Sequence, residues 1–432
     1  MKKGFNYFML IFLISAIFMA SGCKKATVPE VSTVAATEIT INSAVSGGTI
    51  ISDGGEDITE KGVCWSTAVS PTIADSRTNH GTGTDDFVSN IVGLAEGTTY
   101  YVRAYATNDV GTAYGNEITF TTGQVGGAVL TTTEVTNVTS STAVSGGNIT
   151  DDGGGTITAR GICWGPSANP TIEVNNKTTN GTGPGSFSSN LTGLTDGTIY
   201  YYRAYATNSS GTTYGQEYQF ITPVTDIEGN LYKTVKIGNQ VWMAENLKTT
   251  KYNDDTSIPE VTDYTTWGTL TTGAYCWYEN DGDYNKSIYG GLYNWFAAET
   301  GKLCPTGWHV PTDPEFNTLE LTLGLHADSV NIWGWRGTDH GKQMKNTTGW
   351  NEGENGTNTS GFSALPGGYR HNTSGSFNGR STLGYWWTSS DDAANGKPEV
   401  GWYRRLDGIY NDVYKASTLK TAGKSIRCIK ND

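Results

Sequence analysis

The feature that most constrains this chain is an internal repeat with a period of about one hundred residues. The run Ala44–Gly48 recurs as Ala143–Gly147 at an offset of 99, and Thr99–Asn108 recurs as Ile199–Asn208 at an offset of 100. Self-similarity at a fixed period indicates a duplicated structural unit. A unit of this length can build a hydrophobic core of its own. We therefore expect two similar domains in tandem, followed by a different C-terminal region.

Each copy consists of short alternating runs separated by Gly, Asn and Asp, which is typical of an antiparallel β-sandwich. The run from Tyr100 to Thr107 shows this alternation best. The charged side chain of Arg103 marks its face of the strand as solvated. The expected core set is Tyr100, Val102, Ala104 and Ala106, and the expected solvent set is Tyr101, Arg103 and Tyr105.

A spacing before the same strand carries a family resemblance. Leu94 and Thr98 stand six and four residues before Tyr100, and the same spacing leads to Tyr200. It resembles the tyrosine corner of fibronectin type III domains, in which the Tyr hydroxyl ties an inter-sheet loop to a strand. The resemblance implies two fibronectin type III-like sandwiches. We interpret both as spacers, and ligand binding on their loops is the alternative.

The N-terminus predicts export. Lys2 and Lys3 precede a nearly continuous apolar stretch from Phe5 to Met19, and small residues follow up to Cys23. This arrangement resembles the lipobox of bacterial lipoproteins, which implies that Cys23 becomes the lipidated first residue; an ordinary signal peptide is the alternative. No other run approaches the roughly 20 apolar residues of a membrane span. We expect a lipid anchor at the bacterial outer membrane, with surface-exposed or periplasm-facing orientation left open.

Charge and cysteine usage exclude some classes of protein. The 29 basic and 42 acidic side chains give a net charge of −13, which argues against a nucleic-acid partner. With 56 Gly and only 16% charged residues, the chain suits strands and turns better than helical bundles. Cys64 and Cys163 occupy matching places in the two copies, so we expect each to be a buried single thiol.

The composition changes after Pro223, and 11 of the 13 Trp lie beyond it. Val235 to Met243 predicts a hairpin that turns at Gly238-Asn239. Thr312 and Glu315 form a capping box at the start of a predicted helix, and a second helix is predicted over 292–299.

Five ordered motifs in this region resemble the Fibrobacter succinogenes major paralogous domain. They are Val241–Leu247, Gly291–Trp295, Cys304–Thr312, Gly384–Ser389 and Ser425–Cys428. That family is similar in pattern to the C-type-lectin-like fold, which implies paired terminal strands, two helices and a long loop region. The resemblance also implies a disulfide between Cys304 and Cys428 and a single thiol at Cys276. The family brings no established chemistry with it.

Catalytic signatures are absent from the sequence. It contains no Gly-x-Ser-x-Gly, His-Glu-x-x-His or Walker motif, and His309 before the capped helix is interpreted as structural. The lectin-like fold also hosts formylglycine-generating oxidases, but these use a close cysteine pair, and Cys276 and Cys304 lie 28 residues apart. We therefore expect no enzymatic activity.

One acidic stretch suggests a metal. Glu279, Asp281, Asp283 and Asn285 could supply oxygen ligands to calcium, although Lys286 stands where an EF-hand loop requires Gly. A solvated acidic loop without a cofactor is the alternative.

A second group suggests ligand binding. Trp333, Trp335 and Trp350 lie among Gly, Asn and Thr in a stretch without strand alternation, together with Asp339 and His340. Aromatic faces stack on sugar rings, while polar side chains bond to hydroxyls. The sequence predicts that the loop from Ile332 to Thr359 is exposed and makes any ligand contact.

The fold class expected from these observations is mainly β, with two tandem fibronectin type III-like β-sandwiches followed by an α+β C-type-lectin-like domain. The expected segments are a signal peptide (1–22), a lipid anchor and linker (23–32), repeat 1 (33–122), a linker (123–132), repeat 2 (133–223) and the C-terminal domain (225–432). The predicted function is a lipid-anchored cell-envelope binding or adhesion protein with a glycan or an envelope or host protein as ligand. A purely structural envelope protein is the alternative.

Overall fold

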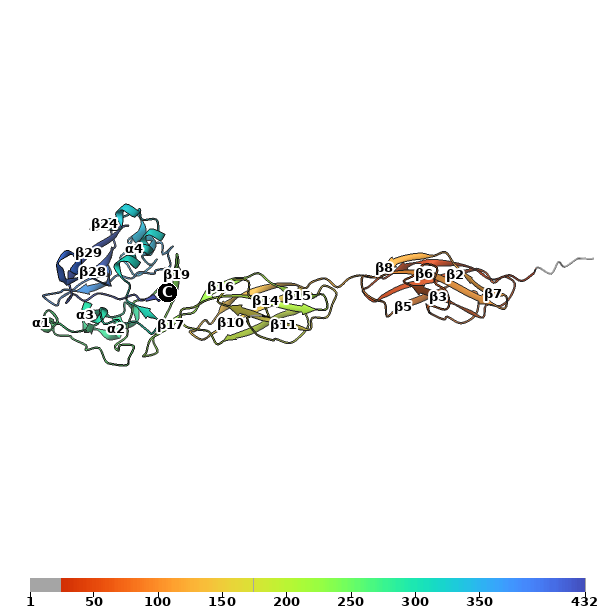
Figure 1. Ribbon diagram of the computed structural model, residues 1–432, viewed down its shortest axis with the longest axis horizontal. Helices are drawn as coiled ribbons and strands as arrows, with labels where there is room; N and C mark the ends of the chain where they lie inside the picture. Colours follow the sequence, from red (N-terminus) through yellow and green to blue (C-terminus); the bar gives the residue numbers. More distant parts are fainter. Residues whose placement is uncertain (1–24, 174, 432) are drawn as a thin grey trace, which may run out of the picture. The chain divides into compact units, whose positions relative to one another are not determined.

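The computed structural model describes residues 25–173 and 175–431 (Figure 1). The signal peptide and the predicted lipidation site Cys23 lie outside the described residues. The chain divides into two compact units, of which the first holds repeat 1 and the second holds repeat 2 and the C-terminal domain. Within the described ranges, none of the helices has the length and apolar character needed to cross a membrane.

Repeat 1 is a two-layer β-sandwich, as the alternating runs predict. One sheet has the order β1-β2-β5, formed by Glu30–Thr37, Ser43–Ser52 and Phe87–Val92. The other has the order β4-β3-β6-β7, formed by Ser76–Arg77, Glu60–Ser66, Thr99–Asn108 and Gly111–Tyr114, and β8 (Ile118–Thr121) also pairs with β6. The core between the layers includes Val31, Ile91 and Val102.

Repeat 2 has the same strand order. Its first sheet is β9-β10-β13, formed by Val129–Thr136, Thr142–Asp151 and Gly185–Thr192. Its second sheet is β12-β11-β14-β15, formed by Asn176–Lys177, Ala159–Gly165, Ile199–Asn208 and Gly211–Tyr214, with β16 (Tyr218–Ile221) also on β14. The duplication seen in the sequence is therefore a duplication of the whole sandwich.

The repeated Gly-Gly pair has a steric reason. A Cβ atom on Gly47 would collide with the carbonyl oxygen of Phe87, and one on Gly146 would collide with that of Phe187. Both glycines lie where two paired strands of the first sheet approach each other closely. Any side chain at these positions would separate the strands, so each copy keeps the motif.

The tyrosine corner is present in both repeats. The Tyr100 hydroxyl accepts a hydrogen bond from the Ala95 amide at 3.0 Å, and Tyr200 accepts one from Thr195 at 3.1 Å. Each bond ties the loop before the long strand to the strand itself. Strand order and corner together make both domains fibronectin type III-like.

The expected solvent face of the long strand is wrong at one position. Tyr105 is fully buried, and its hydroxyl donates to the Thr78 carbonyl at 2.7 Å; Tyr205 does the same with Thr178 at 2.6 Å. The chain after β4 crosses this face, and Gly62 leaves the room that the Tyr105 ring requires. A distant segment thus covers a residue that alternation alone assigns to solvent.

Cys64 and Cys163 are buried free thiols, as their matching positions predict. Burial raises the pKa of each thiol to about 11, so both stay protonated at neutral pH.

The C-terminal domain is a mixed α+β fold built around two sheets. A six-stranded sheet has the order β24-β29-β28-β27-β25-β26, formed by Gly334–Arg336, Val413–Leu419, Lys397–Asp407, Leu383–Asp392, Gly367–Arg370 and Phe377–Arg380. A four-stranded sheet has the order β19-β20-β30-β23, formed by Thr234–Ile237, Gln240–Met243, Ile429–Lys430 and Trp308–His309. The predicted hairpin is β19-β20, and its pairing with β30 brings the two ends of the domain together.

The shorter elements of the domain fill the space around these sheets. The two-stranded pairs are β17-β18 (Val224–Thr225, Leu231–Tyr232) and β21-β22 (Tyr275–Cys276, Leu292–Tyr293). The α-helices are α1 (Tyr264–Trp267), α2 (Gly282–Ile288), α3 (Trp295–Ala298), α4 (Asp313–Thr322) and α5 (His340–Met344). The 3-10 turns are η1 (Tyr278–Asn280), η2 (Ala327–Ser329) and η3 (Ala393–Asn395).

The two predicted helices had different outcomes. Helix α4 begins after the predicted capping box, in which Thr312 and Glu315 bond to each other's backbone amides. The prediction of a helix over 292–299 is wrong at its start, because Leu292–Tyr293 pairs as a strand and Asn294 caps a helix of a single turn, α3. Strand pairing with a distant segment therefore overrides local helix propensity.

The cysteines of this domain are arranged as the lectin-like resemblance implies. A disulfide joins Cys304 to Cys428 across a sequence separation of 124 residues. Cys276 is a buried free thiol whose pKa is raised to about 12 by burial.

Candidate functional site

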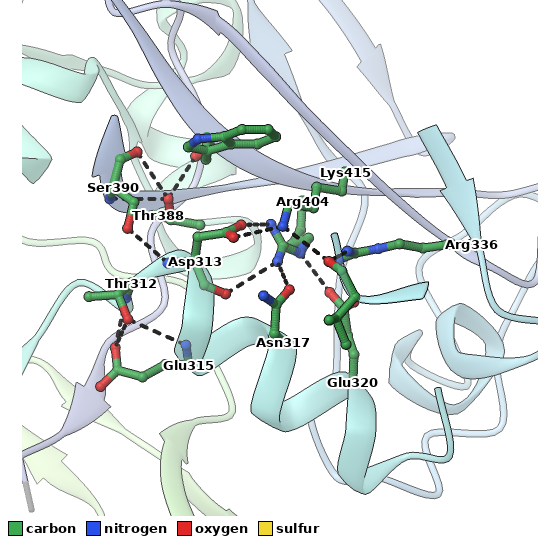
Figure 2. Close-up of polar contacts among 12 residues, drawn as sticks. Thr312, Asp313, Glu315, Asn317, Glu320, Arg336, Thr388, Ser390, Arg404 and Lys415 are labelled. Carbon is green, nitrogen blue, oxygen red and sulfur yellow. Dashed lines mark hydrogen bonds and ion pairs between the residues drawn. The ribbon is translucent and has the colours of Figure 1, made fainter. Parts of the chain in front are cut away.

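The face of the six-stranded sheet that packs against α4 holds a buried network of ion pairs (Figure 2). Arg404 on β28 bonds to Glu320 at 2.6 Å and to Asp313 at 2.7 Å, and Asp313 also accepts from Lys415 at 2.7 Å. Arg336 on β24 pairs with Glu320 as well. Burial alone would raise the pKa of the Asp313 carboxyl. The charges and hydrogen bonds of Arg404 and Lys415 outweigh this effect and hold that pKa below its usual range.

This network holds α4 on the sheet. Each of its three cations bonds to at least one of its two carboxylates, so most of the buried charge is compensated within the network. Thr312 and Glu315 cap the helix beside it, and Ser390 accepts the Asp313 amide at 3.0 Å (Figure 2). We interpret this face as structural.

The opposite face of the same sheet is lined by aromatic rings. We call it the aromatic face and define it by Trp335, Tyr369, Tyr385, Tyr403, Tyr410 and Tyr414. The Trp335 ring lies 4.4 Å from that of Tyr410 and 5.1 Å from that of Tyr414. The Tyr385 ring lies 5.6 Å from that of Tyr403. Among these rings Tyr385 is buried, Trp335 is half-buried and Tyr410 is the most exposed, at 43%.

Two cations lie among these rings. The Arg405 guanidinium is 5.4 Å from the Trp335 ring and pairs with Asp407. The Lys424 ammonium is 4.1 Å from the ring of Tyr403 and 4.3 Å from that of Tyr385. Burial, together with the positive charge of Arg405, lowers the pKa of Lys424 to about 7. On this face Arg405 therefore has both a carboxylate and aromatic rings beside it, whereas Lys424 has the rings of Tyr385 and Tyr403.

Such a face can hold a ligand in two ways. The ring planes of Trp and Tyr supply broad apolar area at low entropic cost, while phenol and guanidinium groups bond to hydroxyls and carbonyls. Rings of this kind suit a sugar or a partner side chain.

Of the predicted ligand residues, the structure brings only Trp335 to the aromatic face. Trp333 is 49% exposed but contacts other partners, with its ring 4.7 Å from Trp402. Gly334 between them has φ of +89°, so the alternation of β24 does not extend back to Trp333. The predicted loop from Ile332 to Thr359 is therefore not one surface.

The assignments of Trp350 and His340 to an exposed loop are wrong. Trp350 is 5% exposed, packs with Phe362 in the core and donates its indole N–H to the Ala364 carbonyl at 3.0 Å. His340 is buried at the start of α5, and its Nδ1 accepts the Thr338 amide at 3.3 Å. Asp339 is exposed, where it accepts the Gln343 side-chain amide at 3.2 Å.

The predicted calcium ligands do not form a metal cluster. Asp281 caps α2 by accepting the Tyr284 amide at 3.1 Å, and Glu279 pairs with Arg380 at 3.6 Å. Asn285 is buried and donates to the Tyr278 carbonyl at 2.9 Å, while Asp283 lies in the first turn of α2. Within residues 25–173 and 175–431, no group of three or more His, Cys, Asp or Glu could hold a metal. The acidic residues begin a helix, which explains their spacing without a cation.

His309 is engaged structurally. Its Nε2 lies 2.8 Å from Glu315, and its Nδ1 lies 2.6 Å from Asn431. These contacts join β23 to the start of α4 and to the end of the chain.

Sequence reasoning missed most of the aromatic face. A usable signal was present in the run Trp402-Tyr403-Arg404-Arg405, because alternation separates Tyr403 and Arg405 from Trp402 and Arg404. Tyr414 joins them only through the pairing of β28 with β29, where it is opposite Arg405.

A family model matches the C-terminal domain. Residues 235–430 match the model of the Fibrobacter succinogenes major domain. The match covers the two sheets, the ion-pair network and the aromatic face. No curated protein matches the sequence of this chain.

Two solved structures are similar to parts of this chain at low TM-scores. The FN1–FN3 domains of chicken CNTN1 match with 16% identity and a TM-score of 0.22, covering 46% of this chain and 69% of that one. A two-domain fibronectin type III segment of chicken tenascin matches with 12% identity and a TM-score of 0.21, covering 45% of this chain and 97% of that one. The description of the sandwiches as fibronectin type III-like rests on their strand order and tyrosine corners.

Proposed function

We propose that this chain is a cell-envelope binding protein whose C-terminal domain holds a sugar-containing ligand against the aromatic face. The observation that carries the proposal is the cluster of Trp335, Tyr410 and Tyr414, whose rings lie within 5.1 Å of Trp335 at the more exposed end of that face. Stacking on such rings stabilises sugars and tolerates variation in the sugar. Arg405 beside them supplies donors for hydroxyl groups.

The lectin-like character of the domain belongs to the same proposal. Terminal strands that pair, as β20 and β30 do, and a disulfide from Cys304 to the last strand region support it. In this proposal the two sandwiches are spacers, and Cys23 anchors the chain by lipid at the outer membrane.

Binding is favoured over catalysis by the state of the thiols. The Cys304 sulfur is bonded to Cys428, and burial keeps the Cys276 thiol protonated with its pKa near 12. Because the thiolate is the reactive form of cysteine, Cys276 is poorly suited to redox or nucleophilic chemistry.

The test is a glycan array probed with the full chain, followed by titration of the best sugar. Trp335→Ala and Tyr410→Ala should each lower affinity by about tenfold, in line with stacking contributions of roughly 1–3 kcal/mol. Trp333→Ala is the matched control, since Trp333 is an exposed indole that does not contact the aromatic face. Equal binding by all variants, or no sugar bound at all, would contradict the proposal and favour a purely structural envelope protein.

The anchor is tested separately by membrane fractionation. Cys23→Ala should release the protein from the membrane fraction or stop its processing. If this variant matures and sediments with membranes as the wild type does, Cys23 does not carry the anchor.

A further inference from the structure

A cavity of about 280 Å³ in the C-terminal domain has an unusual charge. Four cationic side chains line it, and Glu245 is the carboxylate among its lining residues. The cations are Lys233, Lys248, Lys286 and Arg427. The whole chain carries a net charge of −13, so this concentration of positive charge is local to the cavity.

Arg427 is the buried member of this group, with 1% of its surface exposed. Its Nε donates to the Asn246 side-chain oxygen and its Nη2 to the Ser363 carbonyl, both at 2.9 Å. The remaining nitrogen, Nη1, is shielded from solvent and donates to no described residue. Asn246 and Ser363 line the cavity as well, so they hold the guanidinium at its wall.

The position of Arg427 is fixed before any ligand arrives. The same Asn246 oxygen accepts the Trp386 indole N–H at 2.8 Å, and the Asn246 amide donates to the Tyr289 carbonyl at 2.8 Å. The Arg427 guanidinium also stacks 4.3 Å from the ring of Phe362. A donor group held this rigidly loses little entropy when it binds.

Other buried cations of this domain are compensated differently. Arg404 bonds to two carboxylates, and Arg370 donates to four backbone carbonyls, including those of Val261 and Gly375. Among the residues described, Arg427 forms no hydrogen bond or ion pair with a carboxylate and lacks a full set of acceptors, although the charge of Glu245 attracts it from within the cavity lining. Burial lowers its pKa to about 9, so it stays charged at neutral pH. A buried charge that is only partly compensated is costly, and an anion in the cavity would lower that cost.

We infer that this cavity binds a small anion whose carboxylate or phosphate group pairs with Arg427. The planar guanidinium matches either group in two-point geometry, and Lys248 and Lys286 add charge at the cavity. The volume lies near the lower end of ligand pockets, which suits a molecule the size of one acidic or phosphorylated sugar. The inference is independent of the aromatic face and of the proposed function.

Calorimetric titration of the full chain with glucuronate, glucose 6-phosphate and glucose tests the inference. At least one of the two anions should bind at least about tenfold more tightly than neutral glucose, and the tighter of the two identifies the group. Arg427→Gln should lower that affinity by about tenfold or more, as expected when one partner of a buried charge pair is removed. If neither anion binds better than glucose, or if a folded Arg427→Gln variant binds as wild type does, the inference is wrong.

A second variant covers the case in which Arg427→Gln fails to fold. Lys248→Gln combined with Lys286→Gln changes only partly exposed residues, and should weaken anion binding several-fold and reduce its dependence on salt. Lys236→Gln is the matched control, because Lys236 is an exposed lysine outside the cavity. Equal anion affinity in the double variant and in this control would also overturn the inference.

Discussion

Arg404 and Arg405 are neighbours on β28, yet they face opposite sides of the sheet and have opposite surroundings. Arg404 is fully buried under α4 and bonds to Glu320 and Asp313. Arg405 lies among the rings of Trp335, Tyr385 and Tyr414. The first face compensates its charges with carboxylates, whereas on the second face Arg405 has one carboxylate partner, Asp407, and is surrounded by rings that remain partly open to solvent. The comparison suggests that one face maintains the fold while the other is available to a ligand.

The largest expected effect comes from breaking the ion-pair face. In Glu320→Ala the guanidinium groups of Arg404 and Arg336 stay buried, and each loses the carboxylate of Glu320 as its partner. Removing one partner of a buried pair costs about 3–5 kcal/mol of unfolding free energy, and two affected cations favour the upper end. Chemical denaturation of the full chain measures it, and a loss below about 1 kcal/mol would show that this face does not hold the fold.

The next effect distinguishes a core indole from the aromatic face. Trp350→Ala should cost about 3 kcal/mol, the lower end of the range for Trp truncation, because the ring packs in the core beside Phe362. It should leave the affinity for any sugar unchanged in the fraction that remains folded. A stable Trp350→Ala variant that no longer binds sugar would return this residue to the ligand site.

Trp335→Ala should show the reverse pattern. Its ring is half-buried, so its loss should cost less than about 1–2 kcal/mol of stability while sugar binding falls. The measurements are a melting curve and a binding titration on the same sample. A drop in stability as large as that of Trp350→Ala would mean that the aromatic face is also structural.

The buried Lys424 should make stability depend on pH. The pKa of Lys424 is about 7 in the folded protein, against about 10.4 in an unfolded chain, so between these values the unfolded state binds more protons. Wild-type stability should therefore rise, relative to that of Lys424→Met, as the pH is raised from about 7 to about 10. A difference between the two proteins that stays constant over this range would show that Lys424 is charged in the folded state.

The sandwiches could be predicted because their determinants are local. The spacing of Leu94, Thr98 and Tyr100 and the duplicated Gly-Gly pair lie within single strands and turns. Tyr105 was misassigned because the segment that covers it follows β4, more than twenty residues earlier in the chain. Alternation describes one strand and contains no information on what crosses it.

The candidate site was harder to predict for the same reason. Trp350 lies between Gly, Asn and Thr, and the core cluster that buries it is formed by residues outside that stretch, such as Phe362 and Trp386. The aromatic face forms only when β24, β28 and β29 pair across some eighty residues. By contrast, the capping box at Thr312 could be predicted because all its partners lie within four residues.

The disulfide between Cys304 and Cys428 encloses every residue of the aromatic face as well as Arg427. A single cut by a protease anywhere between the two cysteines would therefore leave two fragments that remain covalently joined. The stretch in question includes turns rich in Gly, Asn and Thr, such as 351–361, which are the kind of segment that proteases attack. A domain built in this way can be nicked in a protease-rich surrounding and still keep its strands, and the groups they display, in one piece.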